Sequence, residues 1–209
     1  MKIACLGYRD WALRIYDHLE KNTDNDFLII RSIEDYAEHF IIDFKPDLIL
    51  FYGWSWIIPK NLTNNYDCVM LHPSKLPKYR GGSPLQNQIL DGLKESSVTL
   101  FLVVEELDAG DILRQKDLSL TGSLKEIFAR ITSIGITLTE DILLNGLNPT
   151  PQNHELASYC KRRKPSESEI TIDELQIEDS TYLYNKIRML NDPYPNAYIK
   201  TKEGGKLFL

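Results

Sequence analysis

The fold is decided by residues 47–84, which read DLILFYGWSWIIPKNLTNNYDCVMLHPSKLPKYRGGSP. Two short apolar runs lie in this stretch, at residues 47–52 and 67–71, and each has the length of one buried strand. An irregular segment rich in proline and glycine, residues 72–84, follows the second run. Continuously apolar strands belong to a sheet that is covered on both faces, so this stretch predicts an α/β protein.

The chain before this stretch repeats the alternation of short strands and helices. Apolar runs at residues 2–7 and 27–31 predict two more strands, and helical spacing of apolar residues predicts helices at 11–21 and 33–44. Strands that alternate with helices form parallel βαβ units. We therefore expect a Rossmann-like, mostly parallel sheet with helices on both faces.

Four more elements are predicted after the opening stretch: a helix at 84–93, strands at 97–104 and 111–120, and a helix at 123–144. Ser123 and Glu126 have the spacing of a capping box at the start of that last helix. Glycine and proline then interrupt the pattern at residues 145–153. We place the end of the main domain, residues 1–150, at this point. Residues 151–209 are expected to form a C-terminal extension with a small helix and a hairpin.

Composition excludes several classes of protein. The 209 residues include 24 Lys and Arg against 30 Asp and Glu, so the formal net charge is −6, and we expect no nucleic-acid partner. No run approaches the roughly 18 apolar residues of a membrane span, so we expect no membrane association and a cytoplasmic location. Three separated cysteines and four histidines without ligand spacing indicate neither a disulfide framework nor a metal site.

Two loops carry the candidate acid–base residues. His72 follows the strand at 67–71, and Asp108 lies in the turn EELDAGD, residues 105–111, after the strand at 97–104. We expect both strands to end at the same edge of the sheet, where open α/β sheets bind ligands. His72 and Asp108 would then form an acid–base pair. The alternative is that His72 is a structural residue at the end of a strand.

A third loop, GYRDW at residues 7–11, follows the first strand. It lacks the GxGxxG spacing of dinucleotide-binding proteins, so a nicotinamide or flavin site is not supported. Arg9 is nevertheless placed to meet a phosphate at this edge of the sheet. The alternative is a solvated loop arginine.

The two site loops resemble motifs of the folate-dependent formyltransferase family. The matching runs are HPSKLPKYRGGSP at residues 72–84 and DAGD at 108–111. The segments KRRKP at 161–165 and DPYPNA at 192–197 are similar to the sugar N-formyltransferases of that family. The resemblance implies that N10-formyltetrahydrofolate is the formyl donor and that the acceptor is a primary amine of a nucleotide-linked amino sugar. It also implies a homodimer, since the sugar enzymes are often dimers.

The resemblance also implies roles for particular residues. His72 would move a proton, and Asp108 would orient and stabilise its imidazole. Trp54 and Trp56 alternate like neighbours on a strand, so at most one of them would face the donor. We expect the donor to contact Tyr52, Trp54, Trp56, Ile57, Asp108 and Gly110. We expect the acceptor to contact Tyr8, Arg9, Ser74, Lys78 and Arg80.

Met70 departs from the family pattern, which has an asparagine two residues before the histidine to donate to the developing oxyanion. A thioether cannot donate a hydrogen bond, and loss of one such donor typically reduces the rate by about 10²–10³. Three alternatives follow. A protonated His72 or a backbone N–H donates to the oxyanion, or the side chain of Asn87 or Gln88 donates to it. In the third alternative, the protein binds its ligands without catalysing a reaction. Three functions therefore stay open: formyl transfer, silent binding of folate or sugar nucleotide, and hydrolysis of formyl-folate.

Overall fold

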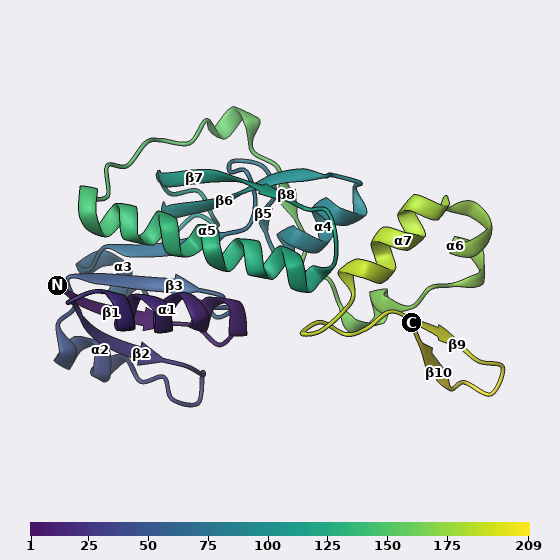
Figure 1. Cartoon of the computed structure of the whole chain (residues 1–209), viewed down its shortest axis with the longest axis horizontal. Helices are drawn as coiled ribbons and strands as arrows, with labels where there is room; N and C mark the ends of the chain where they lie inside the picture. The colour runs from purple at the N-terminus through teal and green to yellow at the C-terminus, as the bar shows by residue number, and fades with distance from the viewer.

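A computed structural model describes all 209 residues, and its centre is a six-stranded sheet in the order β2-β1-β3-β4-β6-β7 (Figure 1). The strands are β1 (Lys2–Leu6), β2 (Asp26–Ile30), β3 (Leu48–Tyr52), β4 (Cys68–His72), β6 (Glu95–Leu102) and β7 (Ile112–Ser119). The pairs among β1 to β4 are parallel, whereas β4–β6 and β6–β7 are antiparallel. The predicted mostly parallel sheet is confirmed.

Helices cover both faces of this sheet, as predicted. The helices α1 (Asp10–Asn22) and α5 (Leu124–Asn145) pack on one face, and α2 (Glu38–Phe44) and α3 (Lys60–Asn65) pack on the other. Successive strand residues point to opposite faces, so Cys5 joins the α1/α5 core while Ala4 and Leu6 join the α2/α3 core. The capping box at α5 is confirmed, because the Ser123 side chain accepts from the N–H of Glu126.

Some element boundaries differ from the prediction for local reasons. The helix predicted at 33–44 begins only at Glu38, because Ser32 and Asp35 form a turn in which the N–H of Asp35 donates to Ser32 Oγ at 3.1 Å. The helix after Pro84 is α4 (Pro84–Leu90), which is shorter than predicted. The short polar helix α3 has no apolar periodicity and was missed.

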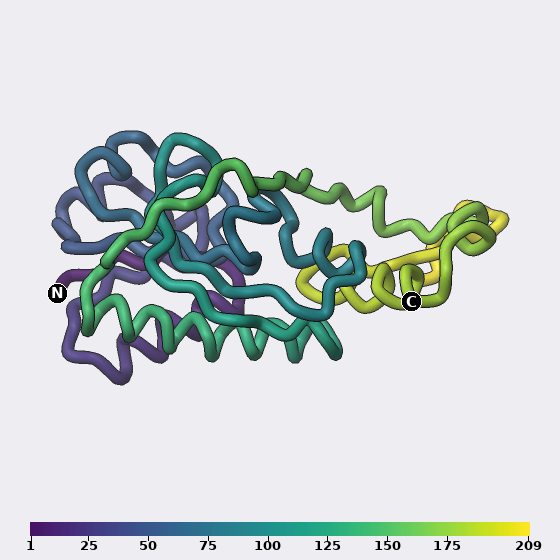
Figure 2. The backbone as a smooth tube through the Cα atoms, turned by 90° about the horizontal axis from the view of Figure 1, so that it is seen from above, coloured from purple at the N-terminus to yellow at the C-terminus, as the bar shows by residue number.

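The chain after α5 returns across the sheet before it reaches the C-terminal elements. Thr150 pairs with Ile112, and the short strand β8 (Tyr159–Cys160) pairs with β5 (Arg80–Gly81). Figure 2 shows this green segment crossing the molecule. A 3-10 turn (His154–Leu156) lies within it, and another (Pro165–Ser168) follows it.

The last elements form one end of an elongated molecule (Figure 1). They are α6 (Ile172–Ile177), α7 (Ser180–Met189), β9 (Tyr198–Lys200) and β10 (Lys206–Phe208). The strands β9 and β10 form the predicted antiparallel hairpin, whereas α6 was not predicted. No helix of the chain has both the length and the apolar character needed to cross a membrane.

Candidate active site

Three neighbouring parallel strands, β1, β3 and β4, bring their following loops to one edge of the sheet. Leu6 pairs with Phe51, and Phe51 pairs with Met70, so the three strands end at nearly the same height. In Figure 1 this carboxyl edge faces the C-terminal elements. The loops after these strands contain Tyr8 and Arg9, residues 53–59 and residues 73–83.

His72 is the last residue of β4 and is buried, with 5 % of its surface exposed. Its Nε2 lies 2.8 Å from the carbonyl oxygen of Tyr79, which can only accept, so Nε2 is the protonated nitrogen in this ring orientation. Tyr79 has a positive φ of 58°, which turns the loop back over His72. The other ring nitrogen, Nδ1, faces Asp108 Oδ2 at 3.6 Å. The structure therefore brings the two predicted residues together.

The chain positions Asp108 beside His72 in a different way from the one predicted. The strands β4 and β6 are antiparallel, and Leu102 at the end of β6 lies opposite Val69 near the start of β4. The expectation that both strands end at one edge is therefore wrong. Residues 103–111 fold back instead, and Asp108 Oδ2 accepts the N–H of Gly81 at 2.7 Å.

Gly110 closes the loop that carries Asp108. A Cβ at this position would lie 1.7 Å from the carbonyl oxygen of Leu102, so no residue with a side chain fits here. Gly110 is buried, and its carbonyl accepts a hydrogen bond from Gln152. It shapes the loop and is not exposed to a bound donor, contrary to the prediction.

Ser74 and Arg80, predicted to meet the acceptor, are both fully buried. Ser74 Oγ donates to the carbonyl of Lys78 at 2.7 Å, and Arg80 donates to Gln152 Oε1 at 2.7 Å and to the Tyr159 hydroxyl at 3.0 Å. Their side chains hold the loop in place, so this part of the prediction is corrected. Lys78 is exposed and stays available to a ligand.

Tyr52 is a further predicted ligand contact that the structure places in the core. Its ring lies on the α1/α5 side, and its hydroxyl is 3.0 Å from Thr139 Oγ1 on α5. Since successive residues of a strand face opposite sides, Tyr52 points away from the α2/α3 side on which Phe51 lies. Its side chain cannot contact a ligand at the carboxyl edge.

Trp54 and Trp56 lie beyond the end of β3, in a loop. Their ring centroids are 4.8 Å apart, and Trp56 also lies 4.8 Å from the ring of Tyr8. The strand-like alternation predicted for them is therefore wrong, because β3 ends at Tyr52. Trp56 is 39 % exposed and Ile57 is 97 % exposed, so both are accessible at this edge.

Arg9 lies between two tyrosine rings. Its guanidinium carbon is 4.6 Å from the ring centroid of Tyr8 and 5.4 Å from that of Tyr194. No carboxylate forms an ion pair with it. Burial raises the pKa of the Tyr194 hydroxyl, so this neighbour stays neutral. Arg9 and Tyr194 are far apart in the sequence, so only the tertiary structure reveals this contact.

Met70 is half-buried on the α2/α3 side, in the same cluster as Trp54, Ile58 and Val103. The two amides considered as replacements for the missing asparagine are both engaged. Asn87 Nδ2 donates to the carbonyl of Ser83 at 2.9 Å, and Gln88 Nε2 donates to the carbonyl of Pro73 at 2.8 Å. Neither is free to donate to an oxyanion, and the Nε2–H of His72 is engaged with the Tyr79 carbonyl at 2.8 Å, so a doubly protonated His72 or a backbone N–H is left as the donor if the site is active.

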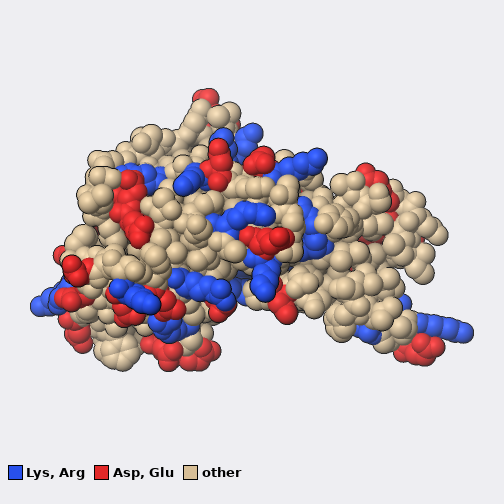
Figure 3. All heavy atoms as spheres, viewed as in Figure 1, with Lys and Arg blue, Asp and Glu red and all other residues tan.

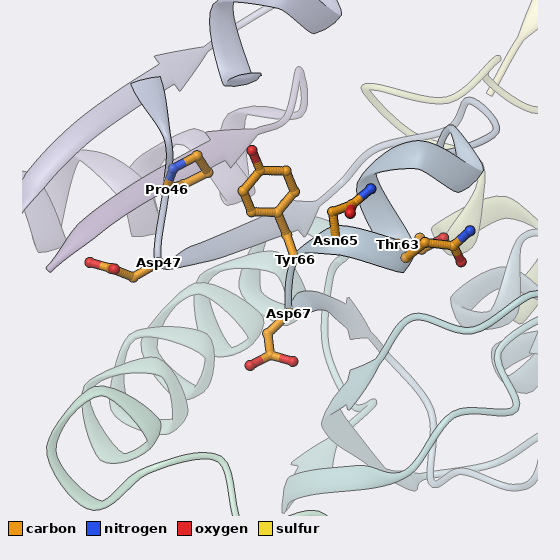
Figure 4. A pocket seen from close by; sticks show the side chains of 7 residues that line it. Pro46, Asp47, Thr63, Asn65, Tyr66 and Asp67 are labelled. Carbon is orange, nitrogen blue, oxygen red and sulfur yellow. The ribbon is translucent and has the colours of Figure 1, made fainter. Parts of the chain in front are cut away.

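A polar hollow lies at the starts of β3 and β4, at the opposite edge from His72 (Figure 4). It is lined by Pro46, Asp47, Thr63, Asn64, Asn65, Tyr66 and Asp67. None of the candidate site residues lines it. No three His, Cys, Asp or Glu side chains are grouped so that they could hold a metal ion.

The fold and the site together define an α/β protein with a buried His–Asp pair under two irregular loops. The chain belongs to the formyl transferase family, whose model matches residues 1–132, so the resemblance found in the sequence is confirmed. A methionyl-tRNA formyltransferase of Sulfurimonas denitrificans is 33 % identical over 174 residues, which are 81 % of this chain and 55 % of that protein. The chain thus spans about half the length of the curated relatives it matches.

Solved structures show the same fold. A methionyl-tRNA formyltransferase from Clostridium thermocellum has a TM-score of 0.87 and 33 % identity, covering 100 % of this chain and 97 % of that chain. A 4-N formyltransferase from Francisella tularensis has a TM-score of 0.78 at 21 % identity, covering 100 % and 96 %. HypX from Aquifex aeolicus in complex with tetrahydrofolic acid has a TM-score of 0.81 at 22 % identity, covering 100 % and 37 %.

Proposed function

We propose that this chain transfers a formyl group from N10-formyltetrahydrofolate to a primary amine. The observation that carries the proposal is the juxtaposition of His72 Nδ1 and Asp108 Oδ2, 3.6 Å apart and almost closed to solvent, in a chain of the formyl transferase family. The attacking amine must lose a proton and the donor nitrogen must gain one. His72 holds that proton, and the Asp108 carboxylate stabilises the imidazolium, more strongly in a site with little water than in bulk solvent.

The donor is proposed to lie between residues 53–59 and residues 103–108. These two loops expose apolar side chains, including Ile57, Val104 and Leu107. An ion pair at 2.6 Å joins Lys60, which follows the first loop, to Glu105 in the second loop. Apolar walls with nearby backbone polar groups suit a flat heterocycle. The similar HypX fold was solved in complex with tetrahydrofolic acid, which supports a folate as the donor.

The acceptor is proposed to be the amine of a nucleotide-linked amino sugar. Arg9, held by two aromatic rings and free of any carboxylate, is suited to a phosphate of such an acceptor. Lys78 is a further exposed cation on the loop after His72. Solved sugar N-formyltransferases share the fold over the full chain, which supports this choice.

Methionyl-tRNA is a second candidate acceptor, because the relatives at 33 % identity are methionyl-tRNA formyltransferases. It also carries a primary amine and phosphates. The net charge of −6 weighs against nucleic acid as a partner, and for that reason we place the amino sugar first.

The first experiment is a titration of tryptophan fluorescence with a stable N10-formyl-folate analogue, on the native protein and on Trp56→Phe. We expect saturable binding, since Trp56 lies on the proposed donor loop. Absence of binding up to millimolar analogue would refute the donor assignment. A panel of amino-sugar nucleotides and methionyl-tRNA, with His72→Asn as control, then identifies the acceptor. Formate release without amine would indicate hydrolysis, and binding without either reaction would indicate a silent binding protein.

Two further expectations belong to this proposal. We propose a homodimer, because the C-terminal hairpin exposes Leu207, Phe208 and Leu209. We also propose a cytoplasmic location, where reduced folates and sugar nucleotides are used. The division into a catalytic domain, residues 1–150, and a C-terminal extension, residues 151–209, is kept as a proposal as well.

A further inference from the structure

Gln152 is a buried side chain that contacts both loops of the site, although it belongs to neither. It is 5 % exposed and lies in the segment that returns across the sheet after α5. Its Oε1 accepts from Arg80 Nη2 at 2.7 Å and from Arg80 Nε at 3.3 Å. Its Nε2 donates to the carbonyl oxygens of Asp108 at 3.0 Å and of Gly110 at 2.6 Å.

These hydrogen bonds form a closed ring that runs through Arg80, Gln152, Asp108 and Gly81. Arg80 precedes Gly81, whose N–H donates to Asp108 Oδ2 at 2.7 Å. Gln152 joins Arg80 to the backbone of Asp108, so the loop after β4 and the loop after β6 are linked twice. Asp108 has a φ of 51°, a left-handed conformation that a residue with a side chain keeps only when its surroundings hold it there. The amide of Gln152 is part of those surroundings.

We propose that Gln152 is a positioning residue that holds Asp108 in place beside His72. This inference rests on the proposed function, and it adds a residue that lies beyond the matched family domain, residues 1–132. It implies that the returning segment, as well as the domain before it, completes the active site.

The chemistry of the position calls for a primary amide. One end of the side chain must accept from a guanidinium, and the other must donate to two carbonyl oxygens. Among side chains of this length, glutamine alone offers both. In Gln152→Glu the contact with Arg80 is kept, but a carboxylate oxygen replaces the donor and faces the Asp108 and Gly110 carbonyls. The Asp108 loop is then pushed away while Arg80 stays paired.

The test compares Gln152→Glu with a matched control, Gln115→Glu. Gln115 is exposed, and its amide also donates to two oxygens, those of the Leu76 carbonyl and Thr99 Oγ1. We expect kcat of Gln152→Glu to fall roughly 10- to 100-fold, because displacement of a catalytic group by about 1 Å has effects of this size. The KM values for both substrates should change less than about twofold, a pattern that a general loss of packing does not produce. Gln115→Glu should leave kcat unchanged.

A second measurement does not depend on activity. The backbone amide hydrogens of residues 103–111 should exchange with solvent faster in Gln152→Glu than in the native protein and in Gln115→Glu. If the native protein transfers no formyl group, the proposed function fails, and this exchange measurement alone decides the role of Gln152. Unchanged kcat or unchanged loop exchange overturns the inference. If Gln152→Glu does not fold, protection of the Gln152 side-chain amide protons in the native protein supports the inference, and their free exchange overturns it.

Discussion

His72 is oriented mainly by a backbone carbonyl, and its contact with Asp108 is the longer of its two polar contacts. The Tyr79 carbonyl holds Nε2 at 2.8 Å, which leaves Nδ1 directed toward Asp108 at 3.6 Å. That gap is too long for a hydrogen bond, and a neutral His72 with its proton on Nε2 has none on Nδ1 to donate, so Asp108 can accept from His72 only when the ring is doubly protonated. The Tyr79 carbonyl therefore decides which ring nitrogen of His72 faces Asp108.

We predict that His72→Asn and Asp108→Asn each lower kcat by roughly 10²–10⁴-fold, the usual contribution of a general acid–base group. Steady-state kinetics with the identified acceptor would measure this. Donor binding by tryptophan fluorescence should persist in His72→Asn, which is not among the expected donor contacts, and this separates a loss of chemistry from a loss of fold. Activity of His72→Asn within tenfold of native would contradict the assigned role.

We predict that Met70→Asn changes kcat by less than about tenfold, because His72 or a backbone N–H already serves the oxyanion. A missing donor would be worth about 10²–10³ in rate. A rise of that size in Met70→Asn would therefore show that the native site is incomplete, and it would favour the silent binding protein. Met70→Leu is the matched control, since it keeps the apolar contact with Trp54, Ile58 and Val103.

At the scale of the elements, the helices α6 and α7 are held together by a charged pair. Lys186 on α7 is 4 % exposed and donates to Glu174 on α6 and to the carbonyl of Glu169. Burial by itself would raise the pKa of Glu174, but Lys186 and the N–H of Thr171 favour the carboxylate, and the net effect lowers that pKa. The carboxylate form therefore stabilises the folded state.

We predict that this pair makes the C-terminal elements sensitive to acid. Because the pKa of Glu174 is lowered on folding, its contribution is complete above the ordinary pKa of about 4.3 and is lost as the pH falls through the folded value. Glu174→Gln should lower the Tm at pH 7, and the difference from the native protein should disappear toward pH 3. Thermal unfolding from pH 7 to pH 3 measures this, and a difference that is constant with pH would contradict it.

At the scale of the whole molecule, the carboxyl edge of the sheet faces a lobe made of α6, α7, β9 and β10 (Figure 1). On the face drawn in Figure 3, Lys and Arg lie among Asp and Glu across the middle of the molecule, whereas this lobe shows few charged side chains except at its tip. In the hairpin β9–β10, β9 is bridged to Glu169 through Tyr198, whereas β10 pairs only with β9, and a two-stranded hairpin is only marginally stable by itself.

We predict that the chain forms a dimer in solution, with a mass twice its own 24.1 kDa in light scattering. Leu207 on β10 is 59 % exposed, and Leu207→Glu should shift the mass to that of the monomer. Leu144→Glu, at an 83 % exposed position on α5, should leave the dimer intact. A monomeric native protein would refute the expectation.

By itself the sequence determined the order of the sheet strands and of the longer helices up to α5, though not the short helix α3, and it determined the sheet class and the family, because apolar periodicity and the HPSKLP and DAGD runs are local patterns. It also predicted that His72 and Asp108 would lie together. Only the tertiary structure decided how they meet, because the antiparallel pairing of β6 with β4 depends on contacts far apart in the chain. The same reason explains the burial of Tyr52, Ser74 and Arg80, and the place of Gln152: whether a polar side chain faces a ligand or the protein is set by distant residues, and no local pattern encodes it.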